Sequence, residues 1–148
     1  MTSPFDLTGK TALVTGANTG IGQGIALALA AAGADIVAAG RSAPVETQKA
    51  VEALGRRFVS IQADFGSTEP VARVVEEAVA ALGGIDILVN NAGIIRRADS
   101  IDFSEDDWDA VMNTNLKTVF FLTQAVAKVM LAKGGGKVIN IASLLSFQ

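Results

Sequence analysis

A short apolar run leads directly into three glycines, and a helical pattern begins among them. The run covers residues 11–14, and the glycines are Gly16, Gly20 and Gly22. The apolar run suits a buried parallel strand, and apolar residues recur at helical spacing from Ile21 to Leu29. Glycine permits a positive φ and close approach of the backbone to a ligand, and the start of a helix attracts anions. The pattern therefore predicts a turn that binds the pyrophosphate of a dinucleotide, although a tight turn with close helix packing could also explain the glycines.

The rest of the chain alternates between strand-like and helix-like segments. Strands are expected at 34–39, 58–62, 86–90 and 137–142, and helices at 45–54, 71–82, 106–112 and 115–132. This alternation predicts a doubly wound α/β fold with a parallel sheet in the order 3-2-1-4-5. We expect one domain over residues 1–148, with its ligand at the carboxyl ends of the strands. The residues of the last helix that we expect to be buried are Val119, Phe120, Leu122, Val126 and Val129.

Composition argues against several classes of function. The chain has no cysteine and no histidine, so we expect no disulfide, no thiol catalysis and no metal. Its net charge is −3 and its basic residues are scattered, which does not suit binding of nucleic acid. No apolar run reaches the roughly 18 residues that span a bilayer, and the N-terminus does not look like a signal peptide. We therefore expect a cytoplasmic protein, away from membranes, with a small-molecule ligand.

The glycine spacing Thr-Gly-x-x-x-Gly-Ile-Gly resembles that of the short-chain dehydrogenase/reductase family. Further matches to the family are Asp64, the segment 90–93 (Asn-Asn-Ala-Gly), the segment 113–116 (Asn-Thr-Asn-Leu) and the segment 139–143 (Ile-Asn-Ile-Ala-Ser). The resemblance implies a Rossmann-like oxidoreductase that interconverts a hydroxyl group and a ketone with NAD, or alternatively NADP, as cofactor. The cofactor-binding residues that it implies are Gly16, Asn18, Thr19, Gly20, Ile21, Gly22, Arg41, Asp64, Phe65, Asn91, Ala92 and Gly93.

The same resemblance implies roles for three polar residues. Ser143 would orient the substrate oxygen, and Asn115 would distort its helix and hold a water molecule of the proton relay. Asp64 would accept a hydrogen bond from the adenine amino group. Each residue also has a purely structural explanation, a turn or cap for Ser143 and Asp64 and an N-cap for Asn115.

The segment after the second strand bears on the choice of cofactor. An acidic residue there would bind the ribose hydroxyls of NAD, whereas an arginine could accept the 2′-phosphate of NADP. Residues 39–42 are Ala-Gly-Arg-Ser, so the acid is absent, and Arg41 could either pair with a phosphate or be a solvated surface residue. Thr19 stands where many NADP-dependent members of the family have a basic residue. These signals conflict, and we favour NAD only because of a closer resemblance to one branch of the family.

That branch acts on 2-deoxy-D-gluconate, and three segments are similar to it: residues 91–97, 104–109 and 141–148. The similarity implies a deoxy sugar acid as substrate, bound by Ser143, Arg96 and Gln148. Arg96 and Arg97 follow the fourth expected strand, and a guanidinium group suits bidentate binding of a carboxylate. Both arginines could equally be solvated surface residues.

The reaction of the family also uses a tyrosine, whose hydroxyl exchanges a proton with the substrate, and a lysine one helical turn later. The chain has no tyrosine, and in the family this motif follows the position of Ser143. We therefore expect residues 1–148 to be the N-terminal part of a longer domain, inactive alone and part of a homotetramer when complete. The alternative is a dinucleotide-binding module without catalysis of its own, which needs a second polypeptide segment for activity.

Overall fold

Residues 4–144, which the computed structural model describes, form a five-stranded parallel sheet in the order β3-β2-β1-β4-β5. The strands are β1 (Thr11–Thr15), β2 (Asp35–Gly40), β3 (Phe58–Gln62), β4 (Ile87–Asn90) and β5 (Lys137–Asn140). Leu13 of β1 pairs with Val37 on one side and with Leu88 on the other. The doubly wound α/β fold and the strand order expected from the sequence are confirmed.

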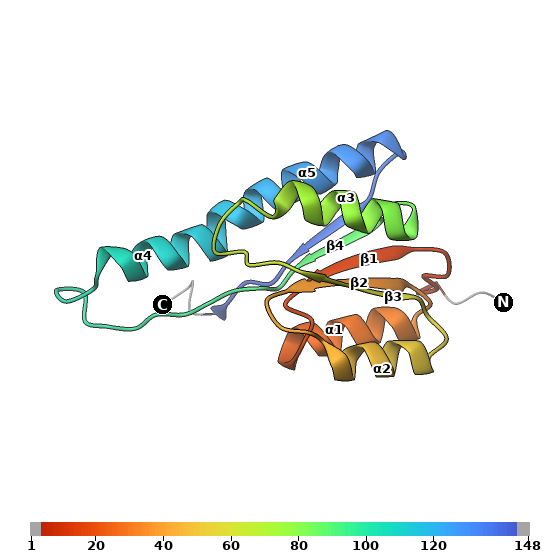
Figure 1. Ribbon diagram of the computed structural model, residues 1–148, viewed down its shortest axis with the longest axis horizontal. Helices are drawn as coiled ribbons and strands as arrows, with labels where there is room; N and C mark the ends of the chain where they lie inside the picture. The colour runs from red at the N-terminus through yellow and green to blue at the C-terminus, as the bar shows by residue number, and fades with distance from the viewer. Residues whose placement is uncertain (1–3, 145–148) are drawn as a thin grey trace.

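Helices cover both faces of the sheet (Figure 1). The helices are α1 (Gly20–Ala31), α2 (Val45–Ala53), α3 (Val71–Leu82), α4 (Glu105–Met112) and α5 (Thr118–Ala132), of which α4 lies away from the sheet. The helices α1 and α2 lie on one face, and α3 and α5 lie on the other. Within the described residues, no helix combines the length and the apolar character needed to cross a membrane.

The two faces of the sheet have separate apolar cores because successive strand residues point to opposite sides. On the α1 and α2 face the core is rich in small side chains, which allow close packing of helix on sheet: Ala12, Ala26, Ala30, Ala34 and Ala38. On the α3 and α5 face the core is built from larger residues, including Leu13, Leu88, Leu122 and Val126. Burial on both faces explains why β1 and β4 are continuous apolar runs without alternation.

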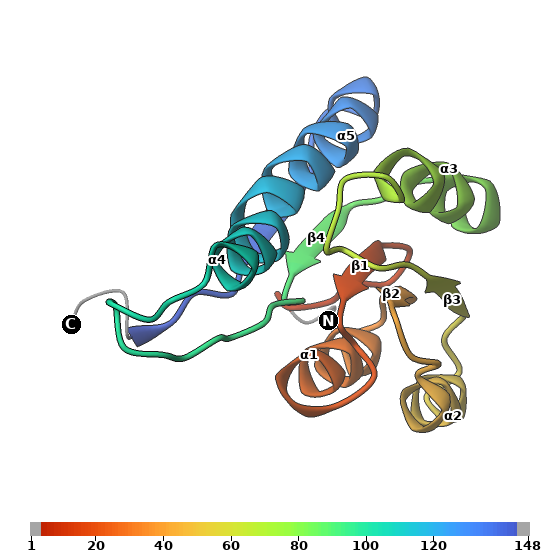
Figure 2. The ribbon, with the colours of Figure 1, turned by 60° about the vertical axis from the view of Figure 1, so that its left-hand side comes forward.

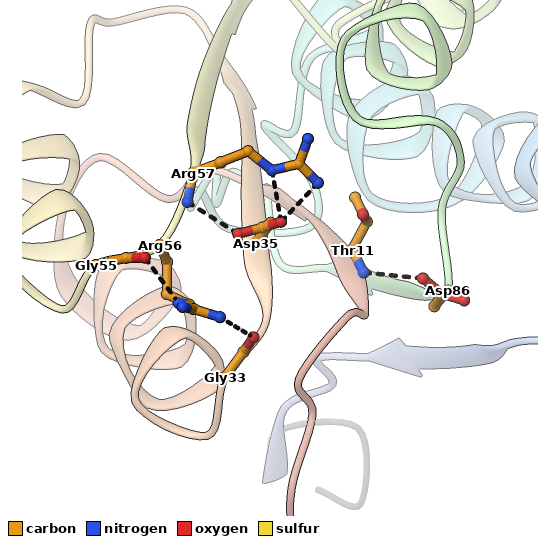
Figure 3. Close-up of polar contacts among 7 residues, drawn as sticks. All are labelled: Thr11, Gly33, Asp35, Gly55, Arg56, Arg57 and Asp86. Carbon is orange, nitrogen blue, oxygen red and sulfur yellow. Dashed lines mark hydrogen bonds and ion pairs between the residues drawn. The ribbon is translucent and has the colours of Figure 1, made fainter.

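Polar contacts join the amino ends of the strands (Figure 3). The Asp35 carboxylate accepts hydrogen bonds from the backbone N–H of Arg57 at 2.9 Å and from its Nε at 2.8 Å, which ties the start of β2 to that of β3. The Asp86 carboxylate accepts a hydrogen bond from the backbone N–H of Thr11 at 2.8 Å, which ties the start of β4 to that of β1. The amino ends are thus held by charged groups, and the loops that follow the strands lie at the opposite, carboxyl ends.

The region before α5 differs from the expected long helix. A π-helix, Asn113–Lys117, separates α4 from α5. Figure 2 shows α4 and α5 continuing each other, and in Figure 1 α4 extends past the ends of the strands. The expectation that Phe120 is buried is wrong, because its side chain is 59% exposed. The helix α5 meets the sheet through residues four apart, Thr118, Leu122, Val126 and Met130, and Phe120 lies on the opposite face. Val119 and Val129 are half-buried.

Candidate functional site

The glycine turn connects β1 to α1 and depends on backbone geometry that only glycine adopts readily. Gly16 has a φ of 66° and Gly20, the first residue of α1, a φ of 58°. A Cβ on Gly22 would collide with the carbonyl oxygen of Gly16 and with Nδ2 of Asn91. Gly22 therefore lets the start of α1 approach the ends of β1 and β4, so that the helix N-terminus faces the carboxyl edge of the sheet.

The Asn-Asn-Ala-Gly segment joins β4 to its neighbours. The Thr15 hydroxyl oxygen accepts hydrogen bonds from the backbone N–H groups of Asn91, at 3.0 Å, and Ala92, at 2.9 Å. The Asn91 Nδ2 donates to the carbonyl oxygen of Thr15 at 3.0 Å. The buried Asn90 donates through Nδ2 to Thr123 Oγ1 at 2.9 Å and to Asn140 Oδ1 at 2.8 Å. These contacts fix the ends of β1, β4 and β5 relative to one another.

A first cleft, of about 340 Å³, lies at this edge of the sheet. Its lining includes Gly16, Asn18, Thr19, Ile21, Gly22, Arg41, Asp64, Phe65, Asn91, Ala92 and Gly93. The structure thus brings together every predicted cofactor-binding residue except Gly20, which begins the helix beside the cleft. The lining also contains Ser42, Ala63, Gly66, Ile94 and Thr114, which the sequence reasoning missed. Most of these directly follow or precede predicted residues, which is the signal that could have found them.

Asp64 has the structural role of a turn residue, and it also lies in the first cleft. Its Oδ1 accepts a hydrogen bond from the backbone N–H of Gly66 at 2.9 Å, as in a turn stabilised by an aspartate side chain. The residue is also exposed and lines the first cleft. An aspartate that forms its turn with one oxygen keeps the second oxygen as an acceptor for a ligand.

A second cleft, of about 410 Å³, adjoins the first. It is lined by Ile94, Ile95, Arg96, Phe103, Trp108, Val111, Met112, Asn115 and Ser143. Ile94 lines both clefts. Three residues predicted for catalysis or substrate binding, Arg96, Asn115 and Ser143, therefore meet in one place, whereas Gln148 lies outside the described residues. The apolar wall of Phe103, Trp108 and Met112 was not predicted.

Asn115 holds the loop where the two clefts meet. It lies inside the π-helix, which excludes the N-cap explanation. Its Nδ2 donates to the carbonyl oxygen of Ile94 at 2.8 Å, and its Oδ1 accepts from the backbone N–H of Ile94 at 2.9 Å. This pair of hydrogen bonds satisfies both backbone groups of Ile94 with a single side chain. Asn115 thereby fixes the position of Ile94 between the first and second clefts.

Arg96 is held at the rim of the second cleft. Its Nε lies 3.1 Å from Oδ1 of Asp107, and its Nη1 donates to the carbonyl oxygen of Ile95 at 3.0 Å. Asp107 lies in the first turn of α4, where its backbone N–H donates to the capping hydroxyl of Ser104 at 3.1 Å. The guanidinium group of Arg96 has five N–H donors, so it can donate to a ligand while it contacts Asp107 and Ile95.

A doubly wound parallel sheet with a glycine turn before α1 and a cleft at its carboxyl edge defines a dinucleotide-binding fold of the Rossmann type. The family described as short chain dehydrogenase matches residues 10–148, and the chain belongs to this family. This confirms the resemblance carried by the glycine spacing.

The relatives include proteins named for sugar-acid chemistry. The 2-dehydro-3-deoxy-D-gluconate 5-dehydrogenase of Escherichia coli K12 is 58% identical over 99% of this chain, which covers 58% of that protein. A structure described as a candidate 2-deoxy-D-gluconate 3-dehydrogenase from Agrobacterium tumefaciens, with bound NADP, matches with a TM-score of 0.87 at 57% identity, over 99% of this chain and 58% of that chain. The 3-oxoacyl-[acyl-carrier protein] reductase of Brucella melitensis, in complex with NAD, has a TM-score of 0.88 at 35% identity, over 94% and 57%. The chain therefore spans less than two thirds of the length of these relatives.

Proposed function

We propose that the protein is an NAD(P)-dependent oxidoreductase that interconverts a secondary hydroxyl group and a ketone on a deoxy sugar acid. The observation that supports this most directly is the junction of the two clefts at Ile94. One cleft contains the glycine turn of a dinucleotide site, and the other contains Ser143 and Arg96. The names of the Escherichia coli and Agrobacterium tumefaciens relatives support a sugar acid as the substrate class.

The residues that line the first cleft suit a dinucleotide in their chemistry. The absence of a Cβ on Gly22 keeps the start of α1 close to the turn, where its backbone N–H groups can bind a pyrophosphate. Asp64 can accept a hydrogen bond from adenine, and Arg41, which is exposed in the lining, can pair with a 2′-phosphate. No acidic residue follows β2 directly, so we propose that NADP binds as well as NAD. When bound, the nicotinamide supplies or accepts the hydride.

The second cleft supplies groups for the substrate. A hydroxyl donor such as that of Ser143 stabilises the negative charge that develops on the substrate oxygen when a ketone is reduced. The guanidinium group of Arg96 can bind the carboxylate of a sugar acid while Asp107 holds Nε. Residues 1–148 have no tyrosine and no histidine, so we assign the proton exchange to the tyrosine that the family resemblance implies, outside residues 1–148.

The proposal is tested with a protein that includes the tyrosine assigned outside residues 1–148, by measuring formation of NADH or NADPH from 2-deoxy-D-gluconate and from 2-dehydro-3-deoxy-D-gluconate. We expect turnover of at least one of these acids with one or both dinucleotides. The matched control is 2-deoxy-D-glucose, which lacks the carboxylate and should react poorly. Dinucleotide binding without turnover of either acid would contradict an enzymatic function for this site.

Replacement of Arg96 by alanine should raise KM for the sugar acid about tenfold or more, because a charge-assisted hydrogen bond contributes about 1.5–3 kcal/mol. The KM for the dinucleotide should stay the same, since Arg96 does not line the first cleft. Arg97→Ala is the matched control, because it removes the same charge from a residue that lines neither cleft. Equal effects of the two variants in steady-state kinetics would show a general electrostatic effect and not a carboxylate site.

We also propose self-association through the outer face of α5, as the family resemblance implies. A groove there is lined by Met112, Asn113, Leu116, Lys117, Phe120 and Phe121. Phe120 is 59% exposed, and its ring packs edge-on against that of Phe121 with centroids 5.3 Å apart. We expect light scattering to give the mass of a homotetramer for the protein and a smaller mass for Phe120→Asp. The same mass for both proteins would place the interface elsewhere.

A further inference from the structure

Thr47 is completely buried near the start of α2, and its hydroxyl connects two other segments to that helix. The hydroxyl donates to the carbonyl oxygen of Ala17 at 2.7 Å and accepts a hydrogen bond from Nε2 of Gln23 at 3.0 Å. Ala17 lies in the glycine turn and Gln23 lies in the first turn of α1. One hydroxyl thus joins the turn, α1 and α2.

The contact with Ala17 fixes the backbone of the turn. In a trans peptide the carbonyl oxygen and the following N–H point in opposite directions, so holding the oxygen of Ala17 also sets the direction of the N–H of Asn18. Asn18 lines the first cleft. Ala17 is buried, and its carbonyl would lose its side-chain partner if the hydroxyl of Thr47 were removed.

The Thr47 hydroxyl also links two parts of the lining of the first cleft, the glycine turn and the segment after β2. The helix α2 begins at Val45, soon after Arg41 and Ser42, which line the cleft at the end of β2. Because Thr47 bonds to the glycine turn, the position of the segment 41–44 depends on that of the turn. A dinucleotide that spans this cleft needs its pyrophosphate and its adenosine ribose to be bound at a fixed separation.

We propose that Thr47 is a positioning residue for the dinucleotide, which holds the glycine turn at the correct distance from Arg41 and Ser42. This proposal rests on the proposed function, because it assumes that the first cleft binds NAD or NADP. Thr47 itself does not line the cleft, so it acts through the turn and not by contact.

The test is isothermal titration of the free protein with NADH and with NADPH. Thr47→Val, which preserves shape and removes the hydroxyl, should raise Kd about tenfold, and Thr47→Ser should restore Kd to within about twofold. Turnover at saturating cofactor should be unchanged in both variants. Thr118→Val is the matched control, because Thr118 is 1% exposed and its hydroxyl has no partner within residues 4–144. It should leave Kd unaltered.

A second readout distinguishes a positioning role from general support of the fold. Hydrogen–deuterium exchange of the free protein should be faster at residues 16–20 in Thr47→Val, and unchanged in the strands. Gln23→Met removes only the hydrogen-bond donor to Thr47 and should raise the dinucleotide Kd by a smaller factor. This variant keeps the proposal testable if Thr47→Val does not fold. An unchanged Kd in Thr47→Val, or no rescue by Thr47→Ser, overturns the role of Thr47. Failure of the wild-type protein to bind either dinucleotide overturns the proposed function and this role with it.

Discussion

Ser143→Ala is expected to lower kcat for the sugar acid by about 10²–10³-fold, the loss that follows removal of one donor to a developing oxyanion. Ser143 lines the second cleft, near Asn115 and Arg96, and not the first. The dinucleotide Kd should therefore remain the same. Steady-state kinetics at saturating cofactor, together with calorimetric titration of NADH and NADPH, measure both quantities.

Ser60→Ala provides the control, because Ser60 is an exposed serine of β3 outside both clefts. It should retain full activity. If Ser143→Ala kept the turnover of the wild-type protein, Ser143 would be only a turn residue after β5. A rise in dinucleotide Kd with unchanged kcat would instead place Ser143 in the cofactor site.

Gly22→Ala should raise the dinucleotide Kd by more than about 100-fold and lower the free energy of unfolding by about 1–3 kcal/mol, as overpacking of a close contact does. The new methyl group would collide with the Gly16 carbonyl oxygen and with Nδ2 of Asn91. Relief of that collision requires α1 to move away from the ends of β1 and β4. The displacement opens the glycine turn and breaks the contact of Asn91 with Thr15. Calorimetric titration and urea unfolding measure the two effects.

Gly24→Ala is a close control, because it adds the same methyl group two residues later in α1. No atom outside the local helix backbone lies within 4 Å of a Cβ at this position. Alanine has the higher helix propensity, so Gly24→Ala should raise the free energy of unfolding by about 0.5–1 kcal/mol and leave Kd unchanged. Similar losses in the two variants would mean that crowding at the turn is not the cause.

The residues of the first cleft could be predicted because the order and direction of the strands determine which loops lie side by side. Asp64, Arg41 and Asn91 follow three different strands, and in a parallel sheet the carboxyl ends of all strands lie at one edge. Once alternation of strands and helices indicates a doubly wound fold, these residues must come close together. The glycine spacing then predicts which end of the sheet carries the dinucleotide cleft.

The second cleft could be predicted only in part. The loop 91–104 carries no helix or strand, so no periodicity places Arg96 opposite Asp107 or brings Phe103 beside Trp108. Thr47 gave no signal either, because a threonine in the first turn of a helix is common and its partner Ala17 is distant in the sequence. The sequence predicts a buried Phe120, whereas the residue lies on the exposed face of α5. The prediction fails because α5 has apolar residues on more than one of its faces, so periodicity alone does not identify the buried one.

The π-helix at Asn113–Lys117 contains one extra residue between α4 and α5, and this residue determines how α4 is rotated about the common helix axis. A π-turn contains one residue more than an α-turn, and one residue of α-helix corresponds to a rotation of about 100°. Deletion of one residue in this segment would restore a regular helix and swing Asp107 and Trp108 around the helix axis, away from Arg96. The glycine turn lies outside this segment and would keep its place on the sheet, whereas Thr114 and Ile94 of the first cleft would move with the segment. Gain or loss of one residue here can therefore reorient the apolar wall of the second cleft while the glycine turn stays unchanged.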